Sequence, residues 1–150
     1  TTAYDALNRP LSTTDANSSV TGVAYDAAGQ QVSQTDGLNH TTTLAYDLAG
    51  RLISATDSLG NVTAYGYNAV GNQVSMTDAN GIVTRYEYDA LNRLAAVVEN
   101  YLGSVTPTPS INVRTEYAYD ANGNRLTIKD ANGPFIDESG EGAASSVTRS

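Results

Sequence analysis

Apolar and aromatic residues alternate with small or polar residues in short runs along this chain. The runs that end in tyrosine include Thr21-x-Val23-x-Tyr25 and Thr42-x-Leu44 before Tyr46. Residues two apart share one face of a strand, and Thr, Val and Tyr favour strands. The pattern therefore predicts short β-strands with a tyrosine-bearing face. The tyrosines expected on that face are Tyr25, Tyr46, Tyr65, Tyr67, Tyr86, Tyr88, Tyr117 and Tyr119.

A second kind of run follows each tyrosine. Its apolar positions alternate with serine or threonine, which indicates a strand with one apolar face and one wettable face, as in a half-buried antiparallel sheet. No run has helical periodicity. The apolar positions are Leu11, Val32, Ile53, Val74 and Leu126.

These runs repeat with a fixed period. Tyrosine followed by Asp or Asn recurs every 21 residues from Tyr4 to Tyr88, and the next copy, Tyr119, comes after 31. A fixed period of this length indicates a repeat architecture in which each unit packs on its neighbours. We therefore look to shape and surface for the function, before any catalytic pocket.

The motif Asp-x-x-Gly occurs twice in each unit and predicts a turn. The Asp side chain can accept a bond from the backbone two residues later, and Gly suits the left-handed conformation that closes a bulged hairpin. Asn replaces Gly at Asn8, Asn39 and Asn92, and Ser18 is the weakest copy. Asn68 and Glu99 replace the Asp, and a turn is still expected at both. The turn residues with the full motif are Asp26, Gly29, Asp47, Gly50, Asp57, Gly60, Asp78, Gly81, Asp120, Gly123, Asp130 and Gly133.

The predicted fold is therefore all-β: a repetitive antiparallel β-hairpin ribbon with two strands per 21-residue unit. It covers residues 1–133, with an inserted loop at about 100–112 that contains Tyr101. Residues 134–150 are expected to hold a second inserted loop and the start of the next strand. Both insertions are rich in Pro, Gly and Ser. We expect them to be surface length variation rather than binding loops, and we expect the chain to be part of a longer array.

Composition and charge disfavour several classes of function. The net charge is −8, but every Asp except Asp137 begins a turn motif, so turn chemistry sets the charge. The eight Lys and Arg residues form no cluster, which disfavours nucleic-acid binding. The chain has no cysteine and no apolar run of ~18 residues, so we expect neither a disulfide framework nor a membrane span. The given residues contain no signal peptide.

Candidate chemistry is sparse, and we expect no enzyme activity and no cofactor. His40 is the single histidine and follows a turn, where a solvated side chain is expected rather than a catalytic base. The runs from Asp78 to Gly81 and from Asp130 to Gly133 resemble part of a calcium loop. They lack the remaining ligands and the terminal Glu of an EF-hand, so we interpret them as turns.

The tyrosine rows have two interpretations. Exposed rows could bind sugars by stacking, whereas half-buried rows would line the sheet, with each hydroxyl reaching a partner at its edge. We favour the second interpretation, because the tyrosines share their strand face with Val23 and Leu44.

The repeat resembles the RHS/YD repeat family. The resemblance is carried by residues 46–52 (YDLAGRL), 57–60 (DSLG) and 84–94 (TRYEYDALNRL), and it extends over residues 3–133. It implies a β-ribbon that spirals into a hollow shell, as in bacterial polymorphic toxins, toxin-complex shells, wall-associated proteins and teneurins. In toxin members the shell encloses a C-terminal effector. No candidate effector or self-cleavage motif is found in this chain.

These observations lead to a leading hypothesis and two alternatives. The first is a structural segment of a secreted or cell-surface protein, whose shell encloses a toxin or effector. Its partners would be further repeats of the same chain and the enclosed domain. The second is an adhesion module that binds a cell-surface glycan or protein, for which Tyr101 is a candidate contact. The third is a calcium-binding repeat.

Overall fold

The computed structural model describes residues 1–103, 110–129 and 136–137. The regular elements in these residues are strands, and the strand pairs are antiparallel. This confirms the predicted all-β hairpin fold. Asp130, Gly133 and the second predicted insertion, apart from residues 136–137, lie outside the described residues. Ile136–Asp137, where the sequence predicted a loop, is a short strand that pairs with Thr127 and Ile128. The chain divides into two compact units, Thr1–Tyr65 and Gly66–Ser150.

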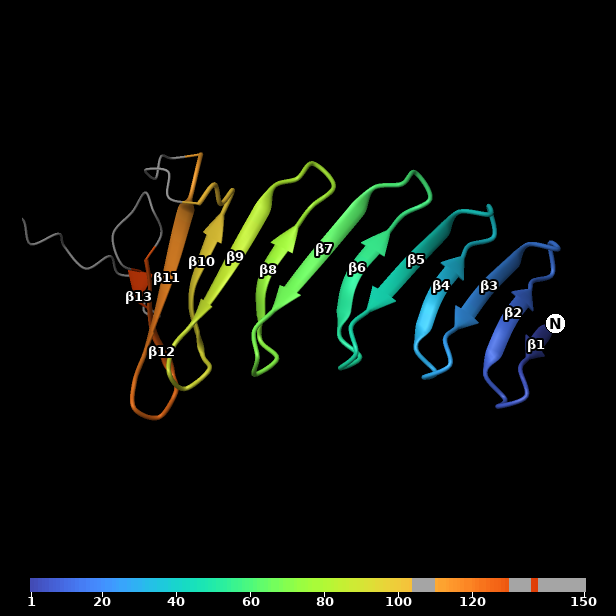
Figure 1. The fold of residues 1–150 in the computed structure, drawn as a ribbon, viewed down its shortest axis with the longest axis horizontal. Helices are drawn as coiled ribbons and strands as arrows, with labels where there is room; N and C mark the ends of the chain where they lie inside the picture. The colour runs from blue at the N-terminus through green and yellow to red at the C-terminus, as the bar shows by residue number, and fades with distance from the viewer. Residues whose placement is uncertain (104–109, 130–135, 138–150) are drawn as a thin grey trace, which may run out of the picture. The chain divides into compact units, whose positions relative to one another are not determined.

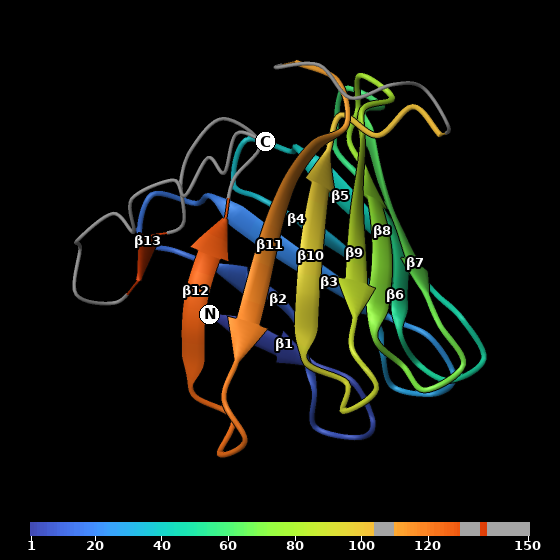
Figure 2. The same cartoon turned by 90° about the vertical axis from the view of Figure 1, so that its left-hand side faces the viewer.

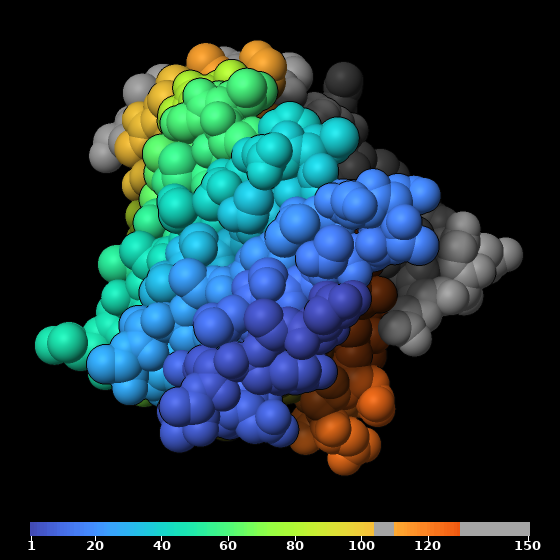
Figure 3. Space-filling model, turned by 90° about the vertical axis from the view of Figure 1, so that its right-hand side faces the viewer, coloured from blue at the N-terminus to red at the C-terminus, as the bar shows by residue number. Residues whose placement is uncertain are grey.

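In the first unit the strands pair in chain order, each with the one before and the one after it. Figure 1 shows them in blue to teal, joined by turns at two opposite edges. In the space-filling view of Figure 3, the blue to cyan atoms of this unit form one continuous surface. The strands are β1 (Thr2–Tyr4), β2 (Pro10–Thr14), β3 (Val20–Tyr25), β4 (Gln31–Thr35), β5 (Thr41–Tyr46), β6 (Leu52–Thr56) and the first part of β7 (Val62–Tyr67).

The second unit contains the end of β7 and the later strands. Its strands also pair in chain order from β8 onward. Figure 2 shows β8 to β12 side by side in that order. The strands are β8 (Gln73–Thr77), β9 (Val83–Tyr88), β10 (Leu94–Glu99), β11 (Val113–Tyr119), β12 (Arg125–Lys129) and β13 (Ile136–Asp137).

Each repeat supplies two strands, as predicted. In the repeat that contains β3 and β4, Val23 lies opposite Gln34, and Gln34 lies opposite Thr42 of the next strand. Residues that face each other across an antiparallel pair lie on the same side of the sheet. The Thr, Val, Leu and Tyr positions predicted to share a face therefore do share it.

In addition to the bulge expected at the left-handed turn residue, a second β-bulge follows each tyrosine–aspartate turn for which the pairing is given, and the sequence pattern did not predict this second one. Ala24 pairs with Ser33, but the next residue, Tyr25, pairs with Gln31, so Val32 is an extra residue in β4. An extra residue interrupts the ladder and increases the local twist. The extra residues at these bulges are Leu11, Val32, Ile53, Ala95 and Leu126.

The expectation of a buried apolar face on the second strands is wrong at three positions. Leu11, Ile53 and Leu126 are 39%, 38% and 49% exposed. Each of them is a bulge residue in a unit whose described strands form one sheet layer, so no second layer covers its side chain. None of the described residues belongs to a helix that could cross a membrane.

The buried apolar side chains of the described residues lie in β10. Ala96 is 0% exposed and Val98 is 5% exposed. Both share a sheet face with Arg114 and Glu87 of the flanking strands. An ion pair of 2.9 Å joins Arg114 to Glu87 across β10. The small core of the second unit therefore lies beneath a salt bridge that spans three strands.

Candidate functional site: the edge where turns meet tyrosines

The turn at Asp57 shows how each reversal is built. Asp57 Oδ1 accepts bonds from the amides of Leu59 (2.8 Å) and Asn61 (2.9 Å). The Gly60 amide donates to the Asp57 carbonyl at 3.1 Å, and Gly60 has a φ of 83°. One carboxylate oxygen thus accepts hydrogen bonds from two backbone amides. The glycine adopts the left-handed backbone conformation that closes the hairpin.

The same arrangement recurs at the other predicted turns in the described residues, except at Glu99. Asn68 replaces Asp and still accepts the amides of Val70 and Asn72, at 3.1 and 2.9 Å. The residues with positive φ that close these turns are Asn8, Ser18, Gly29, Asn39, Gly50, Gly60, Gly71, Gly81, Asn92 and Gly123. The predicted turn aspartates Asp26, Asp47, Asp57, Asp78 and Asp120 each accept the amide four residues later.

The expectation of a turn at Glu99 is wrong. Glu99 is the last residue of β10 and pairs with Val113, and the left-handed residue that follows is Asn100, with a φ of 49°. The carboxylate of Glu is one methylene farther from the backbone than that of Asp. It is therefore not suited to the short turn bond that Asp and Asn make.

Hydrogen bonds lower the pKa values of several turn carboxylates, among them Asp47 and Asp57. The side chain of Asn61 is the main cause for Asp57, followed by the Asn61 amide. The Arg51 side chain has the same role for Asp47. Donors to the charged form favour that form, so both carboxylates are ionised at neutral pH.

Three tyrosine hydroxyls connect successive repeats. Tyr46 donates to the Gln31 carbonyl at 2.9 Å, and Tyr88 donates to the Gln73 carbonyl at 2.8 Å. Tyr119 donates to the Leu94 carbonyl at 2.8 Å. Each acceptor begins the strand that follows the first turn of the preceding repeat, which starts at Asp26, Asn68 or Asp89. We call these contacts tyrosine clamps. All the tyrosines predicted on the strand face, namely Tyr25, Tyr46, Tyr65, Tyr67, Tyr86, Tyr88, Tyr117 and Tyr119, are half-buried.

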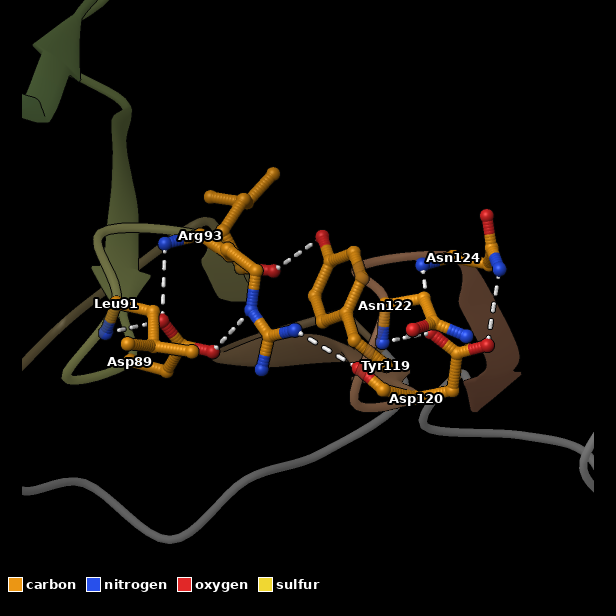
Figure 4. Close-up of polar contacts among 8 residues, drawn as sticks. Asp89, Leu91, Arg93, Tyr119, Asp120, Asn122 and Asn124 are labelled. Atoms are coloured by element: carbon orange, nitrogen blue, oxygen red, sulfur yellow. Dashed lines mark hydrogen bonds and ion pairs between the residues drawn. The ribbon is translucent and has the colours of Figure 1, made fainter.

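Arginines reinforce the connection between repeats, and Figure 4 shows one of them, Arg93. Arg93 Nε lies 2.7 Å from Asp89 Oδ2, and its guanidinium carbon lies 4.6 Å from the centre of the Tyr119 ring. Arg93 Nη1 also donates to the Asp120 carbonyl at 3.2 Å. A guanidinium can thus stack on an aromatic ring while it pairs with a carboxylate.

Arg9 repeats this arrangement in the first unit. Its Nε lies 2.7 Å from Asp5 Oδ2, and its guanidinium carbon lies 4.4 Å from the centre of the Tyr25 ring. The sequence analysis missed these arginines. Their signal is an alternation four residues after each first-turn Asp or Asn, where the chain carries in order Arg9, Gln30, Arg51, Asn72, Arg93 and Asn124.

Tyr101 is fixed to β9. Its amide donates to the Val83 carbonyl at 2.8 Å, and Arg85 donates to its hydroxyl at 2.9 Å. The Arg85 guanidinium carbon is 5.2 Å from the ring centre. Asn112, 5% exposed, accepts the amide of Leu102 at 2.8 Å. The described ends of the first insertion are therefore ordered, and Arg85 occupies one side of the tyrosine ring.

The described residues contain no group of three or more His, Asp or Glu side chains placed to hold a metal ion. His40 is 59% exposed and lies 3.0 Å from the carboxylate of Asp36 in its own turn. Asp78 Oδ1 accepts the amides of Asn80 and Ile82 at 2.9 Å, as in the other turns. The chemistry of this edge is hydrogen bonding and stacking between repeats.

A family model described as RHS Repeat matches the chain in four overlapping stretches, residues 4–41, 25–62, 46–83 and 67–100. These stretches begin at successive tyrosines of the 21-residue period. A search of curated proteins gives no match.

Solved structures of Tc toxin proteins resemble the chain. A crystal structure of TcdB2–TccC3 matches with a TM-score of 0.62 and 26% identity, over 75% of this chain and 6% of that one. A Photorhabdus luminescens Tc holotoxin pore matches with a TM-score of 0.55 and 22% identity, over 86% of this chain and 9% of that one. The chain thus spans less than a tenth of the length of either structure.

Proposed function

Because this chain belongs to the RHS repeat family, we propose that its repeats are part of a shell that encloses a C-terminal toxin or effector in a secreted or cell-surface protein. The chain itself is a structural RHS repeat segment. The solved structures that it resembles are of Tc toxin complexes, and one of them is described as lacking a hypervariable C-terminal region. Those resemblances support the enclosure proposal.

The tyrosine clamps are the observation that best supports the proposal of an enclosing shell. A wall must resist separation of its strands, and strand pairing alone leaves each hairpin free to bend about its neighbour. The Tyr46 and Tyr88 hydroxyls tie each hairpin to the backbone of the previous one. The function that follows is steric. The wall separates an enclosed domain from solvent and from other proteins, and it requires neither catalysis nor a cofactor.

The proposal can be tested in the complete parent protein by limited proteolysis. We expect the region that follows the repeats to resist protease in the intact protein. A parent that carries both Gly50→Ala and Gly60→Ala, which strain two turns, should release that region to the protease. A region cut at the same rate in both proteins would contradict enclosure.

A second candidate function is supported by the turn tips. Leu38 and Leu59 are 76% and 84% exposed, and they lie at equivalent turns, one repeat apart, on the same edge of the first unit. Exposed apolar side chains mark protein-contact sites when they gather. An adhesion role predicts that Leu59→Ser weakens binding to a cell-surface protein, whereas a shell role predicts no change.

A further inference from the structure

A cleft opens in the first unit between two successive turns of the tyrosine edge. Its volume is about 710 Å³. The turn from Asp26 to Gln30 forms one wall, and the turn from Asp47 to Gly50 forms the other. Val32 and Tyr46 also line it. All these residues lie within the first unit, so its geometry is independent of the second.

The cleft occurs at a turn without the arginine that other turns carry. At the preceding turn, Arg9 pairs with Asp5 and stacks on Tyr25 of the next repeat. Gln30 holds the position equivalent to Arg9, and its amide donates to Asp26 Oδ2 at 3.1 Å. Glutamine has no charge, so it supplies no cation to stack on the tyrosine that follows it. Its Oε1 lies beside Gly50, so the Gln30 carboxamide lies in the cleft and a partner's guanidinium would bind against it.

The groups in the cleft match those that bind arginine elsewhere in the chain. Asp26 corresponds to Asp5, and Tyr46 corresponds to Tyr25, one repeat later. A carboxylate oxygen has two acceptor positions, so Asp26 Oδ2 can accept a bond in addition to that from Gln30. Asp47 also lines the cleft, but its Oδ2 is already paired with Arg51 Nη2 at 2.6 Å, so Asp26 supplies the carboxylate for a partner. The net charge of −8 favours the approach of a cation.

We propose that this cleft binds an arginine side chain of a partner polypeptide, with the guanidinium over Tyr46 and beside Asp26. Arg9 and Arg93 make the same contacts within the chain, and they show the geometry that the partner's guanidinium would adopt. Lysine is a poorer fit, because its compact ammonium lacks the planar fork that pairs with a carboxylate while stacking on a ring. This inference concerns recognition at the outer edge of the turns and does not depend on enclosure of a cargo.

The test is a titration of the 150-residue chain with the peptide acetyl-Gly-Arg-Gly-amide, followed by NMR. We expect saturable shifts at the Gln30 side-chain amide and the Tyr46 ring. The matched peptide with lysine should bind roughly tenfold more weakly. Shifts spread evenly over the chain, or equal affinity for both peptides, would overturn the proposal.

Two variants locate the site. Gln30→Arg supplies the guanidinium from within the chain and should abolish peptide binding, whereas Ala16→Arg adds the same charge at the opposite edge and should leave it intact. Asp26→Asn keeps the turn acceptor, as Asn68 does, and should weaken binding roughly tenfold. Unchanged binding by Gln30→Arg would overturn the assignment. The unmodified chain is also tested for self-association. If it associates and the Gln30→Arg variant does not, the cleft binds a second copy of the chain, and the assignment to a different partner is overturned.

Discussion

The Tyr119 hydroxyl donates to the Leu94 carbonyl, 25 residues earlier, at 2.8 Å. The equivalent bond from Tyr88 to Gln73 spans 15 residues and has the same length. The first insertion accounts for the longer interval. It therefore leaves the tyrosine clamp unchanged, and the repeats on its two sides are joined in the same way as the others.

Loss of one clamp should measurably destabilise the second unit. Tyr119→Phe leaves the Leu94 carbonyl without its hydroxyl donor, and we expect a loss of about 1 kcal/mol in the free energy of unfolding. Urea denaturation of the purified chain measures this change.

Tyr117→Phe is the matched control. Tyr117 lies in the same strand and is half-buried, and no hydroxyl bond is found for it among the described residues. We expect its substitution to change stability by less than half as much. Equal effects of the two substitutions would mean that the Tyr119 bond does not hold the repeats together.

A turn glycine should not tolerate a side chain. Gly60 has a φ of 83°, and a Cβ there would meet no atom within 4 Å, so Gly60→Ala isolates the backbone strain. We expect a loss of about 1–2 kcal/mol. Gly22 lies in β3, where an added Cβ would make ordinary contacts at 3.8 Å. Gly22→Ala should therefore be much less costly, and the reverse order in thermal melts would refute the turn argument.

The weakest turn should be improved by glycine. Ser18 has a φ of 65°, a conformation that L-residues other than Asn and Asp rarely adopt. Ser18→Gly relieves that strain but increases the freedom of the unfolded chain, so we expect a net gain of about 0.5 kcal/mol. A lower melting temperature for this variant would contradict the prediction.

Stability should fall in acid because several turn carboxylates, among them Asp47 and Asp57, have lowered pKa values. The pKa values of Asp47 and Asp57 lie below the ordinary value of 3.8. A group with a lowered folded pKa stabilises the fold above its unfolded pKa, and this contribution is lost as the pH falls through the folded pKa. Urea melts should thus be constant from pH 7 to near pH 5 and fall below pH 3.8.

The variant Asp57→Asn distinguishes the titration of this turn carboxylate from the effect of acid on the other ionisable groups. Asp57→Asn keeps the turn acceptor without a charge, as Asn68 does, so its stability should depend less steeply on pH in the acid range. An unchanged slope would show that other groups cause the acid loss.

Local chemistry explains which features the sequence predicted. The turns at Asp26 and Asp47 were predictable, because the Asp acceptor and the left-handed Gly lie within four residues of each other. The strand face of Tyr46 followed from alternation. The bulge at Val32 was not predicted, because an extra residue opposite Tyr25 breaks no local rule and is visible only in the pairing of two strands.

The contacts between repeats were harder to predict. Stacking of Arg93 on Tyr119 joins residues in different repeats, and the first insertion separates them. The alternation of Arg with Gln or Asn was present in the sequence, but its meaning depends on which tyrosine lies beside each arginine. Tyr101 was predicted to lie in a loop. Its contacts with β9 depend on a chain reversal that the sequence pattern does not specify.

NMR of the 150-residue chain tests the central claim most directly, namely that each aspartate turn reverses the chain so that successive strands pair in order. The account predicts nuclear Overhauser effects between backbone protons of Gln34 and Thr42, and of Leu44 and Ala55, which are paired residues in neighbouring strands. Absence of both cross-strand contacts, or helical contacts between residues three and four apart in these segments, would contradict it.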